Sequence, residues 1–264
     1  MSRAELWLRV AATFTLMTIG AFVMLIVAIP TAFLARRFYA EAMAPALGAM
    51  VLRLWGVRVR VHGTPQPASR QTVYIANHSS TIDLFVLIAL GLPRTRFFLS
   101  GFLRKLPPIG IVGSLIRIFW TVPQEFPNKR RAIFKRAQRI LRATGDSVFV
   151  SPEGTRVTTG EIGHFNKGAF HLATSLGAPI VPLYFHIPRA MDPGKGYDAK
   201  PGTVDVYFLP PIVTSGWAVA DVERHRDDVH ALYLRVHDAF RRTGGLPNRL
   251  GIEEEAPVLA EAIA

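Results

Sequence analysis

The stretch "IANHSSTIDLF", residues 75–85, places His78 and Asp83 five positions apart between two apolar runs. On one α-helix, such a separation turns two side chains about 140° apart, so they would face away from each other. The residues before His78 suit a strand, and those after Asp83 suit a helix. We therefore expect His78 in the loop after a strand and Asp83 in the first turn of the next helix, where the two side chains can converge.

The chain after Trp55 repeats this alternation of strand and helix patterns. Helical patterns cover residues 128–143 and 219–242, each closely followed by glycine. Short β-like runs begin at Val57, Thr72, Arg96, Ile118, Ser147, Pro179 and Thr203. The alternation predicts an α/β fold, a single domain whose central, mostly parallel or mixed sheet is flanked by helices.

The N-terminal segment, residues 1–56, is predicted to be a membrane-associated helical anchor. Residues 10–35 carry no charged side chain, and about 20 of them in a helix would reach about 30 Å, near the hydrocarbon thickness of a bilayer. A cleaved signal peptide is the alternative, kept open by the spacing of Ala40 and Ala42. The apolar region of such a peptide is usually only about 7 to 15 residues long.

Three further segments complete the expected organisation. Residues 38–55 are apolar but interrupted by a proline and two charged residues, which favours an interfacial helix or the return arm of a hairpin. Residues 57–245 should form the α/β domain. Residues 246–264 are acidic and are expected to be a mobile tail.

Composition narrows the class of partner. The formal net charge of +12 calls for an anionic partner, either nucleic acid or an anionic lipid surface, and the apolar anchor favours lipid. No RNA-binding aromatic signature appears, so nucleic acid is not expected. The absence of cysteine excludes disulfides and thiolate chemistry. Because His164, His171 and His186 are scattered without ligand spacing, no metal site is expected either.

His78 and Asp83 suggest proton transfer. An aspartate that accepts from one ring nitrogen of histidine fixes its tautomer, so that the other nitrogen can take a proton from a hydroxyl. No G-x-S-x-G motif supplies a nucleophile, which implies that the substrate brings the hydroxyl, as in acyl transfer or hydrolysis. The structural alternative is that Ser80 caps the helix and Asp83 completes a capping box.

A second motif, "VFVSPEGTR" at residues 148–156, resembles a strand running into a turn. Gly154 would allow close backbone approach of a substrate, and Arg156 offers a forked donor suited to phosphate. Alternatively, the motif is an ordinary strand-ending turn with a surface ion pair.

Together, "NHSSTID" and "PEGTR" resemble the glycerolipid acyltransferase family, whose best-known members are the 1-acylglycerol-3-phosphate acyltransferases. The resemblance runs roughly over residues 57–212 and includes the downstream blocks "FNKGAFHLA" and "PIVPLYF". It implies transfer of an acyl group from acyl-CoA or acyl-ACP (acyl carrier protein) to a lysophospholipid, most simply 1-acylglycerol 3-phosphate, giving phosphatidic acid. It further implies no cofactor and a membrane protein whose catalytic domain lies on the cytoplasmic face, where the thioester is made.

The resemblance also implies roles for individual residues. His78 would be the general base and Asp83 its orienting partner. Arg156 would hold the acceptor phosphate. The residues implied to complete the acceptor and acyl-transfer site are Glu153, Gly154 and Thr155.

One block departs from the family pattern. Residues 105–124 should end in a basic residue that helps to bind phosphate, but Pro123 or Gln124 falls there. The missing charge could come from Arg117 or from a downstream cluster, Lys129, Arg130 and Arg131. Two other interpretations stay open: an acceptor lysolipid with a different head group, or a non-catalytic lipid-binding protein with the same fold.

Overall fold

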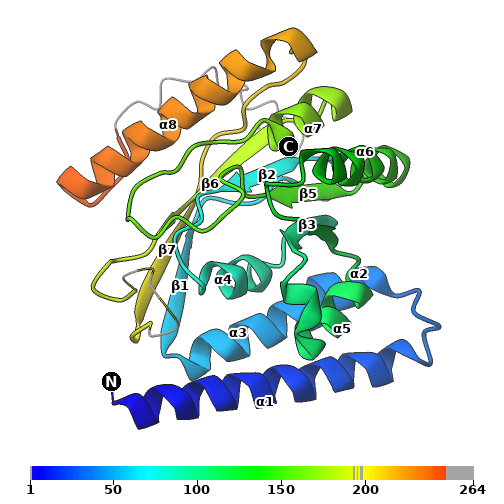
Figure 1. Ribbon diagram of the computed structural model, residues 1–264, viewed down its shortest axis with the longest axis vertical. Helices are drawn as coiled ribbons and strands as arrows, with labels where there is room; N and C mark the ends of the chain where they lie inside the picture. The colour runs from blue at the N-terminus through cyan, green and yellow to red at the C-terminus, as the bar shows by residue number, and fades with distance from the viewer. Residues whose placement is uncertain (1, 193, 195, 197–198, 248–264) are drawn as a thin grey trace, which may run out of the picture.

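The computed structural model describes residues 2–192, 194, 196 and 199–247 and contains a seven-stranded sheet between two layers of helices (Figure 1). The sheet order is β1-β7-β6-β2-β5-β3-β4, and β6, β2, β5, β3 and β4 run parallel. β7 is antiparallel to β6 and parallel to β1. The strands are β1 Val57–His62, β2 Val73–Ala76, β3 Thr95–Ser100, β4 Phe119–Thr121, β5 Ser147–Val150, β6 Ile180–His186 and β7 Gly202–Phe208. The predicted α/β fold with a mixed sheet is confirmed.

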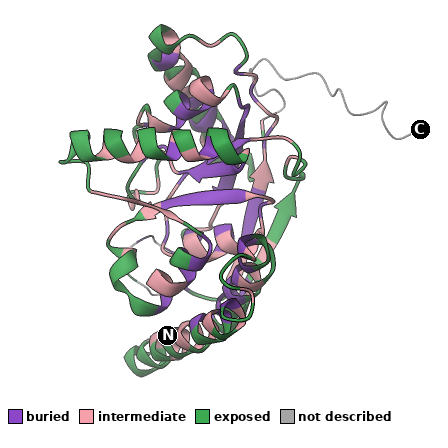
Figure 2. Cartoon of the chain, turned by 90° about the vertical axis from the view of Figure 1, so that its right-hand side faces the viewer, coloured by how far each residue is buried: buried purple, intermediate pink, exposed green. Residues whose placement is uncertain are grey.

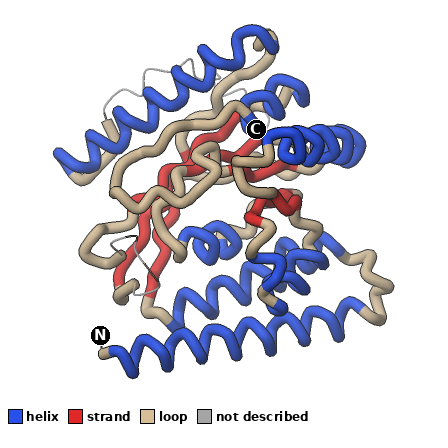
Figure 3. Tube along the Cα trace, in the orientation of Figure 1, coloured by secondary structure: helices blue, strands red, loops and turns tan. Residues whose placement is uncertain are grey.

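Helices cover both faces of the sheet (Figure 3). The helices are α1 Arg3–Ala28, α2 Arg36–Phe38, a π-helical turn Tyr39–Met43, α3 Ala44–Leu54, α4 Asp83–Ala89, α5 Pro107–Leu115, α6 Pro127–Thr144, α7 Gly168–Leu176 and α8 Val222–Thr243, with short 3₁₀ turns at Leu103–Lys105 and Val219–Asp221. One apolar core joins α1, α3, α4 and α5 to the sheet, and a second joins α6, α7 and α8 to its other face. From position 248 onward, the predicted acidic tail lies outside the described residues.

The burial of each strand explains its sequence. All four residues of β2 and of β5 are buried, because helices pack on both faces of these central strands (Figure 2). Their sequences are accordingly runs of apolar and β-branched residues rather than alternating ones. The edge strand β1 alternates valine with polar residues and buries only Val57 fully.

The N-terminal segment forms a helical hairpin along one layer of the domain. α1 begins at a cap in which the Ser2 hydroxyl accepts from the Glu5 amide, and it packs against α3 and α5. The Trp55 indole donates to the Thr13 hydroxyl at 2.7 Å, joining the far end of α3 to α1. Residues 38–55 are thus the return arm of a hairpin, one of the two predicted forms.

α1 leaves most of its apolar surface uncovered. It is the one described helix long and apolar enough to cross a membrane, judged by length and composition. Ala21, Met24 and Ala28 face the domain core, while many large apolar side chains face outward. Those on α1 itself are Trp7, Leu8, Phe14, Ile19, Phe22, Val23 and Ile26. A continuous exposed apolar face of this kind is typical of a surface that contacts lipid or another protein.

A buried charge cluster joins this hairpin to the sheet. Asp146, 3% exposed, accepts from Arg36 at 2.9 Å and from Arg96 at 2.8 Å. Arg36 begins α2, Arg96 lies in β3, and Asp146 directly precedes β5. α6 can end just before Asp146 because Gly145 takes the left-handed conformation, with φ +65°, that terminates many helices. Burial lowers the pKa of Arg36, which the charge of Asp146 opposes.

Replacing Asp146 by asparagine should destabilise the fold by about 3 to 5 kcal/mol, because two buried guanidinium groups would lose their counter-charge. Urea unfolding of both proteins in detergent measures the difference. The exposed Asp227→Asn change on α8 is the control and should leave the free energy of unfolding almost unchanged. Equal effects of the two substitutions would contradict a structural role for the cluster.

Candidate active site

The chain path creates a crevice at the carboxyl ends of β2 and β5. These strands are neighbours in the sheet, with Ile75 paired to Val150. After β2 the chain enters α4 on one side of the sheet, and after β5 it reaches α7 on the other (Figure 1). Adjacent parallel strands whose connections leave in opposite directions open a crevice between them, where α/β proteins typically bind ligands. His78 and Glu153 lie in the two loops that border this crevice.

His78 and Asp83 converge as predicted. His78 Nδ1 lies 2.9 Å from Asp83 Oδ2, and the side chains are 33% and 6% exposed. Because a carboxylate only accepts hydrogen bonds, Nδ1 carries the proton and Nε2 keeps its lone pair. The geometry therefore prepares His78 Nε2 to accept a proton from a bound hydroxyl.

Asp83 also organises the loop that carries His78. The same oxygen, Oδ2, accepts from the amides of Ser79 at 2.8 Å and Ser80 at 2.9 Å. α4 begins at Asp83, and the Ser80 hydroxyl accepts from the Ile82 amide instead of capping the helix amide of Asp83. The predicted capping box is therefore half present: the acidic partner binds the Ser80 amide without a reciprocal hydroxyl bond. The Asp83 carboxylate therefore both binds the loop amides before α4 and orients His78.

Buried Glu153 links the loop after β2 to the loop after β5. It is 4% exposed; its Oε2 accepts from the His78 amide at 2.6 Å and its Oε1 accepts from the Gly163 amide at 2.8 Å. Burial raises the pKa of Glu153 to about 7, while both amide donors oppose this rise by favouring the carboxylate. With both oxygens engaged by backbone amides, Glu153 holds the His78 backbone in place.

The remaining residues of the second motif lie at the surface of the crevice. Gly154 is exposed and has φ +72°, a conformation that a residue with a Cβ adopts only with strain. Thr155 is exposed, and half-buried Arg156 donates from Nη1 to the Thr81 hydroxyl in the first motif. The Val157 amide donates to the His78 carbonyl at 2.8 Å. The structure thus brings Glu153 and Arg156 of this motif, and Val157 directly after it, against the loop of His78.

Arg117 lies elsewhere. It precedes β4, whereas His78 follows β2, and parallel strands place these positions at opposite edges of the sheet. Exposed Arg117, with φ +60°, lines a recess of about 520 Å³ together with Leu25 and Phe33 of the hairpin. Arg117 was one of the cations expected to replace the missing charge of residues 105–124, and the structure does not bring it to His78.

Two residues that the sequence did not mark also hold the site. The side-chain amide of Asn77 donates to the Phe185 carbonyl at 3.0 Å and accepts from the Phe185 amide at 2.8 Å, fixing the end of β2 to β6. Asn166 donates to the Glu153 carbonyl at 3.0 Å. The place of Asn77 inside the first motif could have marked it as a site residue. Its partner, 108 residues away, could not be read from the sequence.

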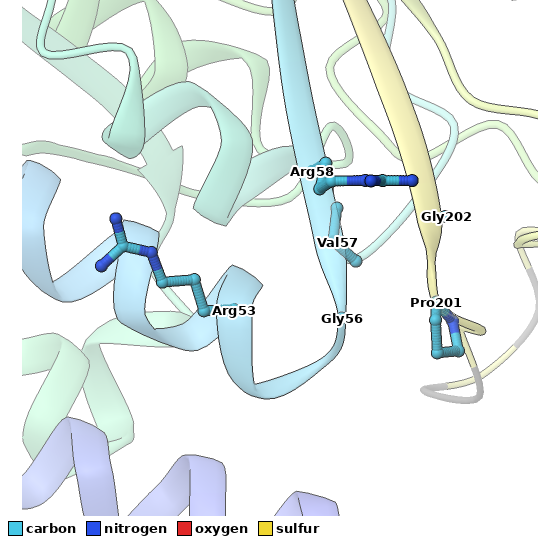
Figure 4. Close-up of a pocket in the computed structure, with 6 residues that line it drawn as sticks. All are labelled: Arg53, Gly56, Val57, Arg58, Pro201 and Gly202. Carbon is cyan, nitrogen blue, oxygen red and sulfur yellow. The ribbon is translucent and has the colours of Figure 1, made fainter.

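Neither of the two recesses described is lined by His78 or Glu153. The second recess, of about 440 Å³, lies at the start of β1 and β7 (Figure 4). It is lined by Arg53 from α3 and Arg58 from β1, and β1 is the third strand from β2 in the sheet. This recess is therefore separate from the crevice.

The raised pKa of Glu153 predicts a pH-dependent stability. The folded protein holds this proton more tightly than the unfolded chain, so the contribution is full below about pH 4.5 and is lost as the pH rises through about 7. Relative to Glu153→Gln, the wild type should lose up to about 3 kcal/mol of unfolding free energy over this range. Denaturant unfolding at several pH values measures the difference, with exposed Glu161→Gln as control. A pH-independent difference would contradict the raised pKa.

Comparison with known proteins identifies the domain. Residues 58–186 match the family model described as Acyltransferase. A 1-acyl-sn-glycerol-3-phosphate acyltransferase of Limnanthes alba is 28% identical over 205 residues, 77% of this chain and 72% of that protein. The human 1-acyl-sn-glycerol-3-phosphate acyltransferase alpha is 30% identical over 189 residues, 69% of this chain and 65% of that protein.

A solved structure shows the same fold. The crystal structure of PlsC, the 1-acyl-sn-glycerophosphate (LPA) acyltransferase from Thermotoga maritima, superposes with a TM-score of 0.66 at 21% identity. The match covers 88% of this chain and 98% of that one. Given this fold, the family-model match and the two motifs in neighbouring loops, residues 58–186 form an acyltransferase domain and the chain is an O-acyltransferase.

Proposed function

We propose that this enzyme transfers an acyl group from acyl-CoA or acyl-ACP to the free hydroxyl of 1-acylglycerol 3-phosphate, giving phosphatidic acid. The observation that carries the proposal is the pair His78 and Asp83, 2.9 Å apart, at a crevice that also holds Arg156. The names of the plant and human relatives support the choice of acceptor.

In the proposed reaction, His78 Nε2 removes the proton from the acceptor hydroxyl, and Asp83 stabilises the imidazolium that forms. The hydroxyl oxygen attacks the thioester carbonyl carbon, and the C–S bond of the resulting tetrahedral intermediate then breaks. The leaving thiolate takes the proton from the imidazolium, which restores neutral His78. Atoms and charge balance without a further reactant, because the thioester is already activated.

The other motif residues take supporting roles in this proposal. Arg156 binds the acceptor phosphate, since its forked guanidinium matches phosphate geometry. Gly154 and Thr155 offer exposed backbone to the substrates beside it. Glu153 acts as a positioning residue through the His78 amide, a role supported by the engagement of both its oxygens.

The location belongs to the same proposal. The exposed apolar face of α1 inserts into the bilayer that contains the lysolipid, and the net charge of +12 favours an anionic lipid surface. The catalytic domain then lies on the cytoplasmic face, where acyl thioesters are made.

Replacing His78 by alanine should lower kcat by about 10² to 10⁴-fold, because the hydroxyl would lose its proton acceptor. Asp83→Asn should lower kcat as well, since an amide cannot stabilise the imidazolium in the same way. Mass spectrometry of phosphatidic acid formed from 1-acylglycerol 3-phosphate and a labelled acyl-CoA measures both. His171→Ala, at an exposed histidine of α7, is the matched control and should keep wild-type activity.

Full activity of His78→Ala would contradict the mechanism. Release of free fatty acid without esterified product would assign thioester hydrolysis instead of transfer. Since Pro123 and Gln124 stand where the family resemblance expects a basic residue, the same assay should include lysolipids with other head groups. Exclusive use of one of these would replace the proposed acceptor.

A further inference from the structure

The first turn of α6 returns the chain to the carboxyl edge of the sheet. After β4, residues 122–126 turn back, and the Phe126 amide donates to the Pro123 carbonyl at 3.2 Å. One helical turn later, Arg130 donates from Nη1 to the Val122 carbonyl at 3.1 Å. Its guanidinium is therefore held at the end of β4, on the same edge as His78.

The other terminal nitrogen of Arg130 lies close to the second motif. A Cβ placed on Gly154 would be 3.6 Å from Arg130 Nη2, 2.9 Å from Gln124 Nε2 and 3.0 Å from Asn166 Nδ2. Three nitrogen-bearing side chains thus gather at exposed backbone directly after Glu153. Two of these nitrogens are already engaged, because Gln124 Nε2 and Asn166 Nδ2 donate to the Glu153 carbonyl at 3.4 and 3.0 Å. The charged Nη2 of Arg130 is therefore the group at this backbone that is suited to an anion.

Arg130 has no counter-charge of its own. Within the described ranges, no carboxylate lies within 4.0 Å of its guanidinium, although the side chain is half-buried. Burial lowers the pKa of Arg130, yet an arginine remains charged in proteins. A partly desolvated cation without an anionic partner is unfavourable, and an anionic ligand would relieve this cost.

The neighbouring cations do not combine partial burial with a position beside Gly154. Lys129 lies over the ring of Phe126, with Nζ 5.0 Å from the ring centroid, and Arg131 is exposed. Residues 122–124 contain no charged side chain. Arg117 lies at the opposite edge of the sheet. Of the cations weighed for the altered block, Arg130 alone combines proximity to Gly154 with partial burial.

We propose that Arg130 binds the phosphate of the acceptor from the β4 side of the crevice, while Arg156 binds it from the β2 side. Arg130 thereby selects lysolipids that carry a phosphomonoester over neutral ones. This inference rests on the proposed function and deepens it. Two guanidinium groups from separate elements can share a dianionic phosphate, whereas a neutral glycerol head group would leave Arg130 without an anion.

The test compares kcat/KM for 1-acylglycerol 3-phosphate and for neutral 1-monoacylglycerol in four proteins: wild type, Arg130→Ala, Arg130→Lys and Arg131→Ala. Arg130→Ala should lose about tenfold to a hundredfold with the phosphate acceptor, mainly through KM, and little with the neutral one. Arg130→Lys should lie between wild type and alanine, because it keeps the charge without the fork. Arg131→Ala, the matched control on the same helix, should behave as wild type.

A parallel measurement separates this inference from the proposed function. Binding of glycerol 3-phosphate to each full-length protein in detergent, measured by calorimetry, should be lost in Arg130→Ala, weakened in Arg130→Lys and kept in Arg131→Ala. If the wild type did not acylate 1-acylglycerol 3-phosphate, the proposed acceptor would fail, and this binding pattern would still decide the role of Arg130. Equal losses with both acceptors, or unchanged glycerol 3-phosphate binding in Arg130→Ala, would overturn the inference.

Discussion

The site depends on one buried carboxylate that joins two loops. Glu153 ends the turn after β5, and its two oxygens bind the amides of His78 and Gly163. Each bond compensates part of the desolvation that raises the pKa of this group. Because the His78 backbone is held by a residue of the other motif, the two motifs form one unit, although 75 positions separate them in the chain.

The sheet makes this link possible. β2 and β5 are direct neighbours, so the residues that follow them emerge side by side at one edge. Asn77 fastens the end of β2 to β6, and the hydroxyl of buried Tyr233, from α8, lies 3.0 Å from the Ile75 carbonyl and 2.9 Å from the Leu183 carbonyl. The strand that precedes His78 is therefore fixed to β6 and to α8, while the His78 side chain stays partly exposed.

Sequence predicted the local features well and the distant contacts poorly. The strand, loop and helix around His78 follow from apolar patterning within a dozen residues, and so does the convergence with Asp83. The return arm of the hairpin was one of two predicted forms, which only its packing against α1 could decide. The partners of Glu153 and Asn77 are set by strand pairing over long separations, and no local pattern encodes them.

The position of Arg117 follows from a strand that the sequence already predicts. A strand beginning at Ile118 already puts Arg117 at its amino end, and in a parallel sheet this end faces away from the site. The position of Arg130 could not be predicted from the sequence, because it depends on the turn that returns α6 to the end of β4.

α6 is held at both of its ends by different parts of the molecule. Its first turn is bonded through Arg130 to the end of β4, and its last turn runs into Asp146, which binds Arg36 of the hairpin. Eighteen helical residues span about 27 Å, and a helix resists both stretching and compression along its axis. The helix is therefore a rigid link of fixed length between the Asp146–Arg36 ion pair and the end of β4. A displacement of either end along this axis displaces the other.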